Sequence, residues 1–188
     1  MRKFATFLCI GFLLTSLSGC TTAYKVARDK RSLKTQARDE NITLKIRDMF
    51  VKDKVVKFLD ISTLCYEGNV YLVGQYDTLK QKKRAVQIAR SVEGVKSVST
   101  YFLPKKKDDP CGTARNLELA ARVKAKLIKD MDIASTNVQV KTVRCHVVLL
   151  GIVGSQNEIA KAIAHARSVD GVRGVKSFLK VKKPSGSP

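Results

Sequence analysis

The sequence predicts an α+β fold made of two tandem copies of one small domain. Each copy is expected to run helix, strand, strand, helix, strand, with two helices on a three-stranded mixed sheet. Three observations support this: a repeat at a constant offset of 77 residues, apolar residues at helical and strand spacing within each copy, and 44% hydrophobic against 28% charged residues, a balance typical of packed domains.

The repeat is clearest where residues 89–96 align without a gap on residues 166–173. The same offset pairs residues of like kind along the whole copy: Ile42 with Leu119, Ile46 with Val123, Phe50 with Leu127, Asp53 with Asp130, Ile61 with Val138, Val70 with Val147, Leu72 with Leu149 and Gly74 with Gly151. We therefore expect two homologous domains, at 39–104 and 114–183, joined by a linker at 105–113.

The first helix of each copy is predicted from apolar residues four apart, as in Leu119, Val123 and Leu127. Two strands follow, at 60–66 and 69–76 in the first copy, joined across Glu67-Gly68, a pair typical of a tight turn.

The second helix is predicted to begin at a capping box, Thr78 with Gln81 and Ser155 with Glu158. Gly94 and Gly171 are expected to end these helices as glycines after a C-cap. Last strands are predicted at 96–103 and 173–182. The apolar positions of these second helices are expected in the core: Ala85, Val86, Ala89, Val92, Ile159, Ala162, Ile163, Ala166 and Val169.

The N-terminus has the features of an export signal. Arg2 and Lys3 precede an apolar run at 4–14, which is too short to span a bilayer as a helix. Leu17-Ser18-Gly19-Cys20 resembles the lipobox of bacterial lipoprotein precursors, which implies a signal peptide at 1–19, cleavage before Cys20 and acylation of that cysteine. An ordinary secretory peptide or an uncleaved anchor is the alternative. Residues 20–38 are expected to form a lipidated tether, and Thr21 resembles an outer-membrane sorting signal.

The charge is strongly positive, with 36 Lys and Arg against 16 Asp and Glu, a net +20. Such a field favours polyanionic partners such as anionic lipid, lipopolysaccharide or nucleic acid. An exported chain does not meet genomic DNA, so the export signal argues against nucleic acid as the partner.

The order of the elements, the strands that reach Gly74 and Gly151, and Val92-Glu93-Gly94-Val95 after the second helix resemble the BON domain of periplasmic and outer-membrane proteins. With the lipobox and the segment 31–36, the whole chain resembles the outer-membrane lipoproteins that carry two BON domains. The resemblance implies a protein held by its lipid anchor at the periplasmic face of the outer membrane, whose second BON domain binds anionic phospholipid through its first helix.

That helix, around residues 117–129, has an apolar strip opposite its core side: Leu117, Ala121 and Ile128. Arg122, Lys126 and Lys129 lie on one flank of the strip and Lys124 on the other. Basic side chains beside an apolar strip suit a membrane interface. The alternative is that the strip packs against the first domain or the tether. Glu118 stands where the lipid-binding relatives carry an aromatic residue, a departure that would weaken insertion.

Three cysteines remain after Cys9 leaves with the signal peptide and Cys20 is acylated. A disulfide between Cys111 and Cys145 is one possibility, and isolated thiols at Cys65, Cys111 and Cys145 are the other.

The positions of the histidines and acidic residues in the sequence indicate no catalytic site, cofactor or metal site. His146 at a strand start and His165 on a helix flank are expected to be ordinary surface residues, and Asp53 and Asp130 to fix the turn after the first helix.

The function expected from the sequence is therefore a non-enzymatic, lipid-anchored binding protein that supports envelope integrity. It would bind anionic phospholipid or dock the outer-membrane protein assembly machinery. The alternatives are a periplasmic chaperone or stress protein with BON domains but no acyl anchor, and a binder of some other polyanion.

Overall fold

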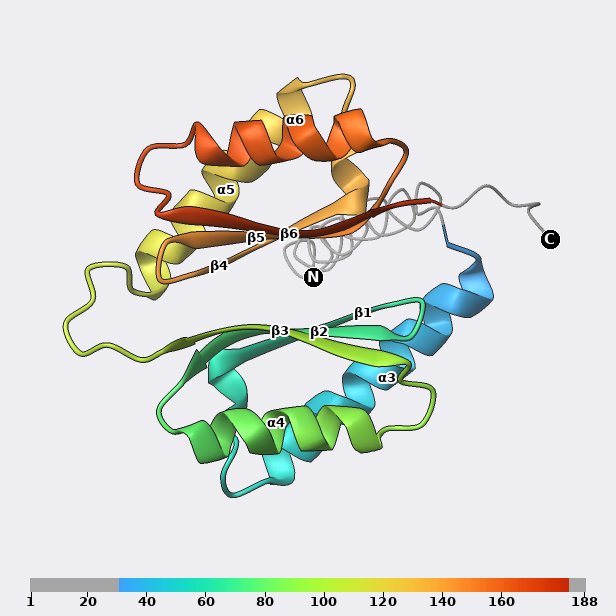
Figure 1. The fold of residues 1–188 in the computed structure, drawn as a ribbon, viewed down its shortest axis with the longest axis vertical. Helices are drawn as coiled ribbons and strands as arrows, with labels where there is room; N and C mark the ends of the chain where they lie inside the picture. The colour runs from blue at the N-terminus through green and yellow to red at the C-terminus, as the bar shows by residue number, and fades with distance from the viewer. Residues whose placement is uncertain (1–30, 183–188) are drawn as a thin grey trace, which may run out of the picture.

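The structure, a computed structural model, describes residues 31–182, so the predicted signal peptide, Cys20 and the tether up to residue 30 lie outside the described residues. The first domain contains α3 (Leu33–Lys52), the 3-10 turn η1 (Phe58–Asp60), β1 (Ile61–Tyr66), β2 (Asn69–Tyr76), α4 (Leu79–Ser91) and β3 (Ser97–Pro104) (Figure 1). The second contains α5 (Thr113–Lys129), η2 (Ser135–Asn137), β4 (Val138–Val143), β5 (His146–Val153), α6 (Gln156–Arg167) and β6 (Gly174–Val181).

The predicted fold class is confirmed. In each sheet the central strand pairs antiparallel with the strand before it and parallel with the strand after it, in the orders β1-β2-β3 and β4-β5-β6. Two helices cover the outer face of each sheet, and the uncovered faces of the two sheets meet in the middle of the molecule (Figure 1). The chain thus forms four layers, helix, sheet, sheet, helix.

Central strands β2 and β5 are buried on both faces because of this stacking. In β2, Val70 and Leu72 point to the helices, while Tyr71 and Val73 point to the other sheet, as the two-residue period of a strand requires. In the contact between the sheets, the rings of Tyr71 and Phe178 lie 5.3 Å apart. The sheet faces hold the two domains together.

The predicted helix starts are confirmed at two capping boxes. Thr78 accepts a hydrogen bond from the backbone N–H of Gln81 at 3.2 Å, and Ser155 accepts one from Glu158 at 3.1 Å. The Glu158 carboxylate also accepts from the N–H of Gly154, so two otherwise unpaired donors at the start of α6 are satisfied.

Some helix ends differ from the prediction. Helix α3 begins at Leu33, inside the segment 20–38 predicted as tether, and the Ser32 hydroxyl accepts there from the N–H of Thr35 at 3.1 Å. The helices also stop before the glycines that were expected to end them: α4 ends at Ser91, and Gly94, at φ +85°, lies in the turn beyond it. Gly171, at φ +89°, follows α6 in the same way.

Gly74 and Gly151 allow a close approach of the preceding 3-10 turn. A Cβ at Gly74 would overlap the carbonyl oxygen of Asp60, and a Cβ at Gly151 would overlap that of Asn137. Both copies therefore need glycine here for a steric reason.

Candidate functional site

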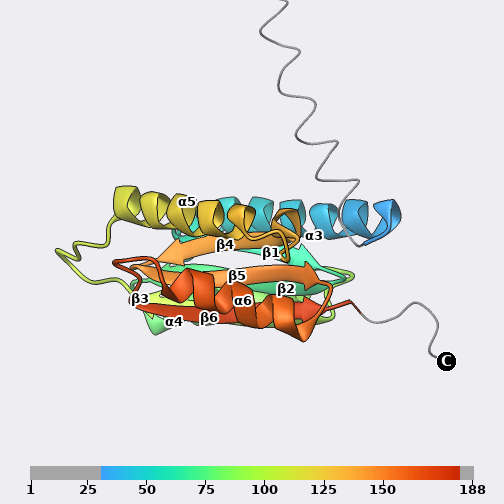
Figure 2. The same ribbon diagram turned by 90° about the horizontal axis from the view of Figure 1, so that it is seen from above.

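Helix α5 is held on the sheet by a fully buried side. Leu119, Val123 and Leu127 have no exposed surface and pack in a core with residues of β5 and α6. This side fixes the rotation of the helix, so the residues half a turn away must face solvent. In Figure 2, α5 and α3 lie along the same side of the molecule, away from α4 and α6.

The predicted apolar strip of α5 is exposed. Leu117 and Ile128 each keep 62% of their surface accessible, and Ala121 lies exposed between them. Neither the first domain nor any other described residue covers the strip, in contrast to the packing alternative. Residues 20–30 of the tether lie outside the described residues.

The strip contains more residues than the sequence predicted. Ala114 and Ala125 are also exposed on this face, and Met131, just beyond the helix, is 98% exposed. Ala114, Ala121 and Ala125 follow the same three- and four-residue spacing as Leu117 and Ile128, and this regularity was the signal that could have identified the full strip.

Three of the predicted basic residues border the strip on the α6 side. Arg122 contacts the backbone carbonyl of Asp170, and the Lys126 ammonium donates to the hydroxyl of Ser168 at 2.7 Å. Lys129 is exposed, and among residues 31–182 no ion pair holds its ammonium group. These bonds run between exposed groups, which water and salt screen strongly, so the three cations remain open to an anionic surface.

Lys124 lies differently from its predicted place beside the strip. Its ammonium group donates to the backbone carbonyl of Val138 at 2.8 Å and also to that of Ser135. It therefore ties α5 to the start of β4, and its charge is directed toward the protein.

Glu118, the acidic residue on this helix, lies between two arginines. Its carboxylate lies 2.7 Å from the guanidinium of Arg115 and 3.6 Å from that of Arg122. The two arginines outnumber this one acid, so the surroundings of Glu118 keep a net positive charge.

The start of α5 is fixed by covalent and ionic bonds. Cys111 and Cys145 form a disulfide with a Cα–Cα separation of 5.5 Å, and Cys65 is a buried free thiol. Nearby, Asp109 accepts from Arg144 at 2.5 Å and from the N–H of Cys111 at 2.9 Å. The hydrogen bond from Arg144, followed by that from the Cys111 backbone, lowers the pKa of Asp109 to about 2.

The end of α5 carries a shallow hollow lined by Lys126, Lys129, Asp130, Met131 and His165. Asp130 is the C-cap residue of the helix; its carboxylate accepts from the N–H of Asp132 at 2.9 Å and meets Nε2 of His165 at 2.7 Å. The hydrogen bond with His165 lowers the pKa of Asp130. Asp53 accepts from the N–H groups of Val55 and Val56 at the matching place after α3. Both aspartates hold the turn after the first helix.

Within residues 31–182 no group of His, Cys, Asp and Glu side chains is placed to hold a metal ion. In the same range, none of the helices has the length and apolar character needed to cross a bilayer.

Comparison with known proteins places both halves of the chain in one family. The family model of the BON domain matches residues 38–102 and again residues 116–183. The chain is 31% identical to the outer membrane lipoprotein DolP of Haemophilus influenzae over 95% of this chain and 91% of that protein. It is 36% identical to the osmotically-inducible protein Y of Escherichia coli over 77% of this chain and 73% of that protein.

Proposed function

The chain belongs to the BON-domain family, and from this membership we propose that it is a non-enzymatic binding protein of the bacterial envelope. The proposed place is the periplasmic face of the outer membrane, with an acyl anchor on Cys20. The lipobox supports the anchor, and the similarity to an outer membrane lipoprotein along 95% of the chain supports the location. Its proposed role is to support envelope integrity, with the outer-membrane protein assembly machinery as a further candidate partner.

We propose that the second domain binds anionic phospholipid through α5. The observation that carries this proposal is the exposed apolar strip of α5, bordered by Arg122, Lys126 and Lys129. The acidic side chains near these cations, Glu118, Asp130 and Asp170, each lie within ion-pair distance of a basic side chain of the same domain. Apolar side chains gain about 1.5–3 kcal/mol each when fully buried, and each basic residue near an anionic surface adds about 1 kcal/mol.

These contributions suit a weak contact made by a protein that is already anchored. Leu117, Ile128 and Met131 are the three large apolar side chains of the strip. An acyl chain on Cys20 would keep α5 at a high local concentration near lipid, so a modest intrinsic affinity suffices. The second contact would then select anionic lipid, which the acyl anchor does not.

The test is vesicle flotation of the chain from Thr21 onward, comparing anionic with zwitterionic vesicles. Ile128→Asp should abolish binding to anionic vesicles, because it places a negative charge on the apolar strip. Lys129→Glu should weaken binding about tenfold or more, since it replaces attraction by repulsion.

The matched control is Val51→Asp, the residue that the 77-residue offset aligns with Ile128. Val51 is exposed on α3 as Ile128 is on α5, so the substitution should leave both the fold and vesicle binding unchanged. Equal flotation of Ile128→Asp and the parent protein would contradict the proposal.

A soluble stress protein of the periplasm is the second candidate. It is favoured by the 36% identity to the osmotically-inducible protein Y, which exceeds the 31% identity to the lipoprotein. Labelling of cells with radioactive palmitate separates the two, because only the anchored form incorporates label, and only when Cys20 is present.

A further inference from the structure

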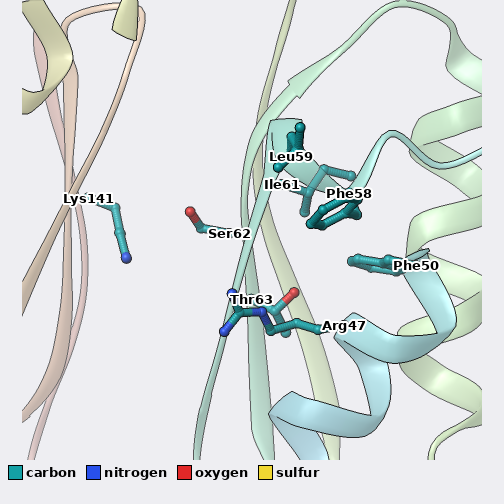
Figure 3. A pocket seen from close by; sticks show the side chains of 8 residues that line it. All are labelled: Arg47, Phe50, Phe58, Leu59, Ile61, Ser62, Thr63 and Lys141. Carbon is teal, nitrogen blue, oxygen red and sulfur yellow. The ribbon is translucent and has the colours of Figure 1, made fainter. Parts of the chain in front are cut away.

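A groove follows the seam between the two domains on the side of α3 and α5. Three hollows adjoin along it, and Lys141 of β4 lines all of them. The central hollow is closed on the first-domain side by Arg47 of α3 and by Ser62 and Thr63 of β1 (Figure 3). The site thus takes residues from both domains and is incomplete in either domain alone.

The two cations of the central hollow are available for a ligand. Arg47 is exposed and Lys141 half-buried, and in the described part of the chain neither has a carboxylate within ion-pair distance. The described lining of the central hollow contains no acidic residue. Arginine and lysine placed on opposite walls of one hollow suit an anion with several oxygen acceptors.

A hydroxyl group supports the same assignment. Ser62 of β1 is half-buried, and its hydroxyl points into the gap toward Lys141, whereas Thr63 points to the helix side of the strand (Figure 3). A hydroxyl can donate a hydrogen bond to an oxygen of a bound anion.

The first-domain side of the hollow also carries apolar side chains. Phe58 and Leu59 lie beside Arg47, with Leu59 85% exposed at the rim, and the buried Phe50 and Ile61 lie behind them (Figure 3). Leu59 also lines the next hollow along the seam, together with Leu117 of α5. An alkyl chain that leaves the anion site would therefore find apolar side chains along the groove.

We infer that the seam between the domains binds an amphiphilic phosphate, with the phosphate between Arg47, Ser62 and Lys141 and its alkyl chain against Phe58 and Leu59. The phosphate position uses no residue of the α5 strip and does not depend on the proposed vesicle contact, although Leu117 of the strip lines the neighbouring hollow.

The experiment is an NMR titration of the chain from Thr21 onward, which contains every described residue, with octyl phosphate below its critical micelle concentration. Inorganic phosphate and octanol serve as the head-only and chain-only probes. Octyl phosphate should shift the amide signals of Ser62, Thr63 and Lys141, inorganic phosphate should bind at least tenfold more weakly, and octanol should leave these signals unchanged.

Substitutions assign the binding to the groove. Arg47→Gln and Lys141→Gln should each weaken octyl phosphate binding about tenfold, and Ser62→Ala, which removes only the hydroxyl, several-fold. Lys45→Gln, which removes an exposed cation from the same helix as Arg47, is the control and should have no effect.

Three results would overturn the inference: equal affinity for inorganic and octyl phosphate, shifts confined to α5, or an Arg47→Gln variant that binds as the Lys45→Gln variant does. Ile128→Asp distinguishes this site from the vesicle contact, because it should abolish flotation while leaving the octyl phosphate titration intact.

Discussion

Helices α3 and α5 occupy the same place in the two domains but differ in their outward faces. The strip positions Leu117, Ala121, Ala125 and Ile128 of α5 align with Glu40, Leu44, Asp48 and Val51 of α3. Two acidic residues therefore interrupt the face of α3, whereas α5 has apolar side chains at both places. The buried sides stay alike, with Ile42, Ile46 and Phe50 matching Leu119, Val123 and Leu127. The buried residues of the two helices are therefore alike, as the common fold requires, whereas the exposed residues differ.

The turns between the first two strands also differ between the two domains, although they occupy the same place in the fold. In the first domain Asp39 accepts from the N–H groups of Glu67 and Gly68, and Arg31 pairs with it at 2.6 Å. In the second domain Asn116 takes the place of Asp39 and accepts from the N–H of Cys145 at 2.9 Å. Cys145 aligns with Gly68 and has a left-handed backbone, φ +60°, which the disulfide to Cys111 helps to hold.

The largest expected effect concerns the glycines that both copies share. Gly151→Ala should lower the free energy of unfolding by about 3 kcal/mol or more, because the new methyl group overlaps the carbonyl of Asn137 and φ is +140°. Gly74→Ala creates a similar overlap without a left-handed φ and should cost less. Urea unfolding of both variants measures this difference. Losses below about 1 kcal/mol would show that the close approach is not required.

The disulfide should stabilise the second domain alone. Its two cysteines are 34 residues apart, and Cys111→Ser should lower the free energy of unfolding by about 2–4 kcal/mol because the unfolded chain gains freedom. Urea unfolding with and without reductant checks this. Reductant should lower the stability of the parent protein but not that of Cys111→Ser, which has no disulfide to lose. An equal loss of stability in both proteins would contradict a stabilising role of the disulfide.

A smaller effect should appear in acid, again in the second domain. The Asp109 carboxyl has a pKa of about 2 in the fold against an ordinary value of 3.8. Its ion pair therefore contributes fully above about pH 4 and is lost as the pH falls toward 2. The stability difference between the parent and Asp109→Asn should shrink over this range in thermal unfolding scans. A difference that is constant from pH 5 to pH 2 would disprove this contribution.

Much of the fold was predictable because the core positions repeat. The offset aligned Leu119, Val123 and Leu127 with their counterparts, and hydroxyl caps such as Ser155 marked helix starts by a local hydrogen bond. The stacking of the sheets was not predicted, although the nearly continuous apolar run of β5 from Val147 to Val153 is typical of a strand covered on both faces. Which surface would cover the second face depends on contacts between distant residues, which spacing along one strand does not encode.

The candidate site was predicted in its position but not in detail. Helical spacing identified Leu117 and Ile128 as outward-facing, and the structure places them so. Helical spacing alone could not show that Lys124 donates to the carbonyl of Val138, because residues of another element come near only in the tertiary fold. For the same reason the groove between Arg47 and Lys141 was not predicted.

An exchange of strip residues between the two helices tests the central claim most directly. One variant carries the acids of α3 on α5, Leu117→Glu with Ala125→Asp, and the reciprocal variant removes them from α3, Glu40→Leu with Asp48→Ala. Flotation with anionic vesicles should be at least tenfold weaker for the first variant, and the second should bind at least as well as the parent. Undiminished binding by the first variant would contradict the account, because it would show that the apolar strip of α5 does not make the contact.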